Sequence, residues 1–172
     1  LMKLFIKKLI LWPRDPNFRP REIEFSSDKI NVLTGASGTG KSTITAIIDY
    51  CLGSGKCAIP VGKIRKKCAW YGVLLQLEHE QMLVARQDPN DKIENGTMYI
   101  EEGVEVSIPP FIKEKDANVN VELFKDKMDV LAGIPVIKDS EKSPEFARPV
   151  YPAFRDLAAF NFQPQHIVAN PH

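Results

Sequence analysis

The sequence predicts an α/β fold in which an antiparallel sheet lies beside a core built around a glycine-rich loop. An apolar run, a loop with three glycines and an amphipathic helix follow one another between residues 29 and 52. Further along, short strand-like segments separated by tight links favour hairpins. The 172 residues, 44% hydrophobic and 26% charged, suit one domain with a buried core.

The first third of the chain is expected to lead into the glycine loop through strands. Residues 2–12 are rich in leucine and isoleucine and predict the first strand, and residues 21–25 predict a short alternating strand after a proline-rich loop. Residues 29–34 predict a strand whose apolar run ends at the loop. Residues 42–52 have apolar positions at helical spacing, and Gly53 is expected to end this helix.

The rest of the chain is expected to hold hairpins and helices after a connector. The first helix there should have Asn118 or Asn120 near its N-cap, because asparagine side chains cap helices well. The segments are a connector at 53–68, hairpins at 68–80 with 81–87 and at 97–103 with 104–110, and helices at 118–134 and 153–160.

The glycine loop has the spacing of a phosphate-binding loop, with two glycines five positions apart followed by lysine and serine. Its backbone N–H groups and the N-terminus of the next helix favour phosphate oxygens. Lys41 supplies a charge for the β- and γ-phosphates, Ser42 a hydroxyl for Mg²⁺, and Thr43 supports the helix start. No guanine-reading Asn-Lys-x-Asp motif is present, which favours ATP. The predicted cofactor-binding residues are Gly35, Ala36, Ser37, Gly38, Thr39, Gly40, Lys41, Ser42 and Thr43.

No predicted strand ends in a convincing catalytic carboxylate. Hydrolysis needs carboxylates that hold Mg²⁺ through water and activate the attacking water. Glu101 and Glu102 follow a short apolar run and are interpreted as a solvated turn, and Asp129 falls in a helical pattern. The sequence therefore predicts a nucleotide-binding lobe without its catalytic lobe.

The run GASGTGKSTITAIIDYCLG resembles the start of the head of an SMC-type (structural maintenance of chromosomes) ABC ATPase. The upstream strands and two later strands, the second ending at Arg86, follow that family's plan, although Ser37 replaces the usual asparagine of the loop. The resemblance implies that residues 1–172 are the N-terminal lobe of an ABC-type head. The coiled coil and the C-terminal lobe, with its signature and Walker B motifs, would lie elsewhere.

The resemblance also implies site residues and partners. The segment FNFQPQHIVAN near the C-terminus is the candidate for the glutamine that senses Mg²⁺ and the γ-phosphate, and either Gln165 or Gln163 fits. Lys41 and these glutamines are the catalytic candidates, with Ser42 and Gln165 at the metal. Two heads are expected to dimerise with ATP at their interface and to act on DNA, with a nuclease as a further partner.

A basic run suggests where DNA would bind, namely Lys63, Arg65, Lys66 and Lys67. A solvated basic loop explains the same run, and the neighbouring Trp70 and Tyr71 are expected to pack in the core. The net charge of +1 predicts no global attraction to polyanions.

Other features exclude some classes of protein. The absence of an apolar run of about 18 residues predicts no membrane span, and the three cysteines lack metal-ligand spacing, which favours reduced thiols in the cytoplasm. The alternative function is a self-contained P-loop kinase or other small NTPase, for which Arg148 and Arg155 are lid candidates.

Overall fold

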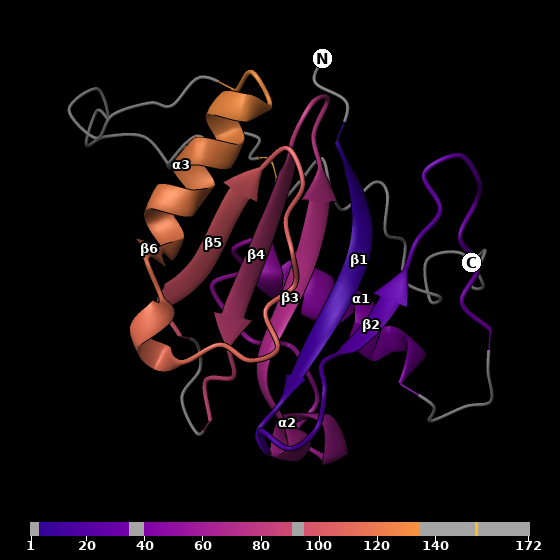
Figure 1. Cartoon of the computed structure of the whole chain (residues 1–172), viewed down its shortest axis with the longest axis vertical. Coiled ribbons are helices and arrows are strands. Elements are labelled where there is room, and N and C mark those ends of the chain that lie inside the picture. Colours follow the sequence, from indigo (N-terminus) through magenta and orange to yellow (C-terminus); the bar gives the residue numbers. More distant parts are fainter. Residues whose placement is uncertain (1–3, 35–39, 91–94, 135–153, 155–172) are drawn as a thin grey trace, which may run out of the picture.

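Six strands form one antiparallel sheet in the order β2-β1-β3-β4-β5-β6 (Figure 1). The computed structural model describes residues 4–34, 40–90, 95–134 and 154. The strands are β1 (Phe5–Pro13), β2 (Arg21–Glu24), β3 (Cys68–Gln76), β4 (Gln81–Gln87), β5 (Thr97–Gly103) and β6 (Val119–Asn120). The helices are α1 (Lys41–Cys51), α2 (Lys63–Lys67) and α3 (Val121–Leu131), and a 3₁₀ turn spans Glu114–Asp116.

The central strands are buried on both faces, so the sheet separates two apolar layers. Along β3, Val73 and Leu75 face a core that α1 and α3 complete, whereas Leu74 faces a smaller core with Val106 and Ile112. Successive side chains of a strand point to opposite faces, which explains why an unbroken run of apolar residues suits β3. In Figure 1, α1 lies behind the sheet and the chain after β5 crosses its front.

One glycine leaves room for a tryptophan ring on the sheet. A β-carbon on Gly72 of β3 would lie 2.5 Å from Cζ3 of Trp12 on β1. The Trp12 ring therefore occupies the space above Gly72, and its indole N–H donates to the Pro109 carbonyl at 2.8 Å. This contact ties the crossing segment to the sheet.

Most of the predicted elements are confirmed. β1, β2, α1, β3, β4, β5 and α3 occupy the segments that the sequence predicts. Gly53 has a left-handed φ of +97° just after α1, as expected for a residue that ends a helix. Asn120 is the N-cap of α3, where its side chain accepts from the Leu123 N–H at 2.8 Å, while Asn118 bonds the backbone of Ile100 in β5.

The strand predicted at 29–34 is wrong for this structure. The segment has no regular secondary structure, and Ile30 and Val32 are 91% and 73% exposed. The two edge strands of the described sheet are β2 and β6, and neither pairs with the segment. Instead, Asn31 closes a local loop by exchanging hydrogen bonds of 2.8 Å with the backbone of Ser26.

The hairpin predicted for 97–103 with 104–110 is also wrong. β5 pairs with β4 and β6, and residues 104–110 leave the sheet edge. Val106 donates its N–H to the Gln81 side chain at 3.0 Å, and two prolines in the segment lack the N–H that a ladder needs. The connector at 53–68 holds the short helix α2, which the sequence did not predict.

The expected short helix at 153–160 lies outside the described residues except for Phe154. Cys51 and Cys68 are buried and Cys57 is half-buried, and all three are free thiols. No helix in the described ranges combines the length and the apolar character that a membrane crossing requires.

Candidate functional site

The N-terminus of α1 has the backbone that a phosphate loop needs. Gly40 precedes the helix with φ +88° and ψ 13°, a left-handed conformation that favours glycine. Lys41 then begins the helix, the Ser42 side chain is exposed, and Thr43 is buried with its N–H bonded to the Gly40 carbonyl at 3.0 Å. Residues 35–39, the rest of the predicted loop, lie outside the described residues, as do Gln163 and Gln165.

The charge and capping of this helix end favour an anion. No side chain caps the N-terminus of α1, and its first turn has no acidic residue. The first N–H groups of a helix have no intrahelical acceptor, and the helix dipole adds partial positive charge there. Lys41 adds a full positive charge, and the exposed Ser42 hydroxyl is a ligand type that Mg²⁺ accepts. These residues therefore fit the triphosphate and Mg²⁺ of a nucleotide.

The opposite end of α1 is fixed by a buried arginine. Arg86 on β4 has 0% exposure, and its Nη1 donates to the carbonyls of Tyr50 and Ser54 at 2.8 and 2.7 Å. Its Nη2 donates to the Asn95 carbonyl at 2.6 Å. A cation beside the last carbonyls of a helix opposes the negative end of the dipole. Arg86 thus anchors the C-terminal end of α1 on the sheet.

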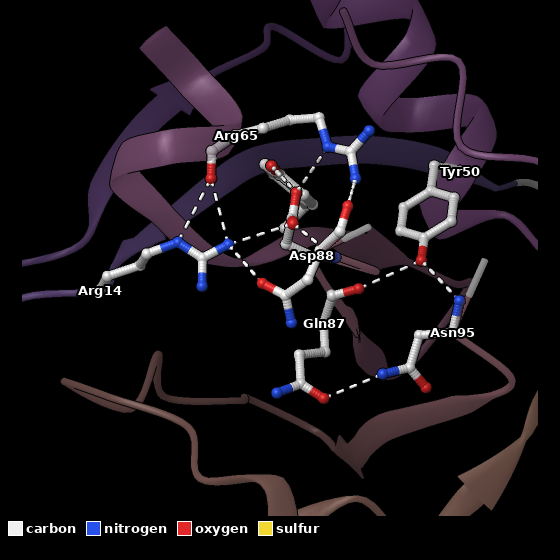
Figure 2. A network of polar contacts seen from close by, with 8 residues as sticks. Arg14, Tyr50, Arg65, Gln87, Asp88 and Asn95 are labelled. Atoms are coloured by element: carbon white, nitrogen blue, oxygen red, sulfur yellow. Dashed lines mark hydrogen bonds and ion pairs between the residues drawn. The ribbon is translucent and has the colours of Figure 1, made fainter. Parts of the chain in front are cut away.

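Tyr50 adds a second link between α1 and the sheet. Its ring lies 3.9 Å under the Arg86 guanidinium, a cation–π geometry. Its hydroxyl donates to the Gln87 carbonyl and accepts from the Asn95 N–H, both at 3.1 Å (Figure 2). Burial raises the pKa of Tyr50 to about 12, partly opposed by the charge of Arg86. The phenol is therefore neutral under ordinary conditions.

A second polar network surrounds Asp88, which follows β4 and is only 2% exposed (Figure 2). Its Oδ1 accepts from Arg14 at 3.1 Å and from the Asn90 N–H at 2.8 Å. Its Oδ2 accepts from Arg65 at 3.1 Å and from the Tyr71 hydroxyl at 2.7 Å. Burial and the bond to Asp88 raise the pKa of Tyr71 well above its usual range. Four donors and two positive charges offset the cost of burying this carboxylate.

The helix α2 lies between the Asp88 network and the phosphate loop. Cδ1 of Ile64 lies 3.8 Å from the position that a β-carbon on Gly40 would take. The next residue, Arg65, turns toward Asp88 and also donates to the Asn90 carbonyl. Adjacent residues of this short helix thus lie beside Gly40 and in the Asp88 network.

The predicted DNA-binding residues separate into two groups. Lys63, Lys66 and Lys67 are exposed on α2, whereas the Arg65 side chain is only 12% exposed and is paired with Asp88. The exposed lysines could contact a phosphate backbone, whereas the guanidinium of Arg65 is already bound to Asp88. As predicted, Trp70 is buried in the core.

The acidic residues that the sequence singled out have structural surroundings. Glu101 and Glu102 lie in β5 rather than in a turn, and both are exposed as expected. Glu102 pairs with Lys127 of α3. Asp129 lies on α3, where its Oδ1 accepts from the Phe154 N–H at 2.7 Å. Within the described ranges, no group of three or more His, Cys, Asp or Glu side chains could hold a metal ion.

The Asp88 network is the part of the site that sequence reasoning missed. Arg14 comes from the loop after β1, Arg65 from an unpredicted helix and Tyr71 from the middle of β3. They are 17 to 74 positions from Asp88, so no local spacing signals them. The one signal is Asp88 itself, since an aspartate directly after an apolar strand and before a proline often fixes a turn.

Comparison with known proteins gives one match. The model of a family described as an AAA domain matches residues 17–129, which include the phosphate-loop motif, all of α1 and α2, and the Asp88 network except Arg14. No curated protein and no solved structure matches the chain significantly.

Proposed function

The chain belongs to the AAA-domain family of P-loop ATPases that is found in SMC-like proteins, and from this premise we propose that it is the ATP-binding half of an SMC-like ABC ATPase head. In this proposal two heads dimerise with ATP between them and act on DNA in repair, maintenance or phage defence. The observation that carries the nucleotide site is the left-handed Gly40 followed directly by the uncapped, acid-free N-terminus of α1. The implied C-terminal lobe and nuclease partner belong to the same proposal.

The residues of this chain would divide the work of binding. Backbone N–H groups of residues 36–41 would surround the phosphates, and Lys41 would offset the charge on the β- and γ-phosphates. Ser42 would hold the Mg²⁺, with Gln165 or Gln163 as the second contact. When bound, Mg·ATP would supply the Mg²⁺ ion and the phosphoanhydride bond that is hydrolysed. The anchoring of α1 by Arg86 keeps these groups in place before the nucleotide arrives, which lowers the ordering cost of binding.

Dimerisation would follow from differential binding. ATP that contacts both a phosphate loop and the signature motif of a second head binds the closed pair more tightly than the open one. The carboxylates that activate water would come from the C-terminal lobe. On this proposal the 172-residue chain binds Mg·ATP and turns it over little or not at all.

The test is a titration with Mg·ATP beside a turnover assay on the same chain. Lys41→Ala should abolish binding, and Lys56→Ala, which removes an exposed lysine after α1, should leave it unchanged. Binding without turnover supports the half-site. Robust turnover that Lys41→Ala abolishes would overturn the half-site in favour of a self-contained NTPase, and tight binding retained in Lys41→Ala would overturn the phosphate loop itself.

DNA binding is tested separately on α2. The Lys66→Gln/Lys67→Gln double variant should weaken binding to duplex DNA and reduce the slope of log K against log salt by about 0.9 for each lost phosphate contact. Lys113→Gln/Lys115→Gln, a pair of exposed lysines after β5, is the matched control. Equal losses in both double variants, or no loss in either, would remove α2 from the DNA proposal.

A further inference from the structure

The position of α2 depends on contacts from outside the helix. Five residues are too few for a helix to be stable by itself in water. Arg14 contacts the C-terminal end of α2. The Arg14 N–H donates to the Lys67 carbonyl at 2.8 Å, and the Arg14 guanidinium donates to the Arg65 carbonyl at 3.1 Å. The guanidinium also brings positive charge to the end of the helix where the carbonyls lack intrahelical donors.

Asp88 is the residue that joins these contacts. Its carboxylate bonds both Arg14 and Arg65, one through each oxygen, so the loop after β1 and the side of α2 are held on a single buried charge (Figure 2). The Asp88 N–H donates to the Ala69 carbonyl at 2.8 Å, which fixes Asp88 itself to β3 next to the end of α2. Loss of the charge would leave two arginines without their counter-ion.

The other side of α2 contacts the phosphate loop. Ile64 is partly buried and packs against the main core, and its Cδ1 lies 3.8 Å from the position that a β-carbon on Gly40 would take. Gly40 has the left-handed φ on which the start of α1 depends. Packing beside this residue restricts the other conformations that a glycine allows. A chain of contacts therefore runs from Asp88 through Arg65 and Ile64 to Gly40.

We propose that Asp88 is a positioning residue for the phosphate loop, acting through α2 and Ile64. The inference rests on the proposed nucleotide site, although Asp88 itself touches no nucleotide. When Asp88 holds α2 in place, Ile64 keeps Gly40 in the conformation that binds phosphate. When the charge is removed, that conformation is less populated, and the apparent dissociation constant rises by the same factor.

The test measures Mg·ATP affinity and, without nucleotide, hydrogen exchange of the amides of residues 40–43. Asp88→Asn keeps the shape of the side chain and removes its charge. It should raise the dissociation constant by about 3- to 10-fold and speed exchange in the first turn of α1. Ile64→Ala should do both as well. Arg65→Gln interrupts the same series of contacts at a less buried position, and it replaces Asp88→Asn in the test if that variant does not fold.

The matched control is Asn120→Ala, which removes the N-cap of α3 at the end of the edge strand β6. It should lower the melting temperature by about 2–4 °C with no change in affinity or in exchange at residues 40–43. The Asp88→Asn/Ile64→Ala double variant should be no worse than the worse single variant, because residues acting along one path are not additive.

Several results would overturn the inference. The first is that Asp88→Asn, or Arg65→Gln if Asp88→Asn does not fold, keeps wild-type affinity and exchange. The second is that Asn120→Ala changes affinity and exchange as much as Asp88→Asn does. The third is that the effects of the two substitutions add in the double variant. Failure of the proposed function looks different, because the wild-type chain would then bind no Mg·ATP or Lys41→Ala would still bind it. In that case exchange at residues 40–43 still decides whether Asp88 positions Gly40.

Discussion

Gly40→Ala isolates the backbone requirement of the phosphate loop. A β-carbon there would lie 3.8 Å from Ile64 and 4.0 Å from the Thr43 hydroxyl, which are ordinary contacts. The cost therefore comes from the φ of +88°, and a left-handed L-residue costs about 1–2 kcal/mol. The melting temperature should fall by about 2–8 °C, as expected for a chain of this size. Relaxing the strain would turn the first N–H groups of α1, so Mg·ATP affinity should fall at least about 5-fold.

Gly53→Ala is the control at the other end of the same helix. Gly53 has a φ of +97°, and a β-carbon there would lie 3.2 Å from Cγ of Lys125, which must shift slightly. Gly53→Ala should lose at least as much stability as Gly40→Ala and keep wild-type affinity. Urea unfolding and a Mg·ATP titration on both variants make the comparison. Equal losses of affinity in the two variants, or none in Gly40→Ala, would refute the claim that the left-handed glycine prepares the phosphate site.

Three further predictions concern the fold that holds α1. Arg86→Leu leaves two buried carbonyls and one half-buried carbonyl without their donor, and it should lower the free energy of unfolding in urea by about 3 kcal/mol or more. Arg86→Lys should recover part of this loss; a loss under about 1 kcal/mol in Arg86→Leu would contradict the anchor. Gly72→Ala drives a β-carbon to 2.5 Å from Trp12 and should cost about 3 kcal/mol, whereas a wild-type melting temperature would show that the ring can move. Alkaline pH should destabilise the protein through Tyr50, because its pKa of about 12 in the folded state exceeds the value near 10 in the unfolded state. The stability that the neutral Tyr50 contributes is fully present below pH 10. It is lost as the pH rises toward 12, by about 2 kcal/mol. Tyr50→Phe should flatten that slope in urea titrations across this range, and an unchanged slope would mean that Tyr50 titrates normally.

The sequence predicted the elements whose signals are local. The apolar run of β3, the helical spacing of α1 and the cap at Asn120 each need only neighbouring residues, and each is confirmed. The segment 29–34 has an equally good strand pattern, but a strand forms only where another edge is free to pair. The described sheet has free edges at β2 and β6, but neither pairs with 29–34, so the apolar pattern of this segment is left exposed. Pairing partners are set by the whole fold and cannot be read from one segment.

The candidate site divides in the same way. The motif around Lys41 is contiguous, and its last glycine and the helix after it have the predicted backbone. The Asp88 network is assembled from the loop after β1, from α2, and from β3 and β4, so its members become neighbours only when the sheet register is set. The antiparallel pairing of Tyr71 with Arg86 brings the start of β3 beside the end of β4, where Asp88 follows.

The two networks act on opposite ends of one helix. Arg86 and Tyr50 fix the C-terminal end of α1 to β4, while Asp88 reaches the N-terminal end through α2 and Ile64. Arg86 lies near the end of β4 and Asp88 directly follows this strand, so the register of β4 with β3 places the residues that hold both ends of α1. An 11-residue helix is about 16 Å long, and a helix held at one end alone could still pivot at the other. Holding both ends is therefore what a phosphate site on this helix requires, because a loop that must bind phosphate through backbone N–H groups cannot correct a misplaced helix with side chains.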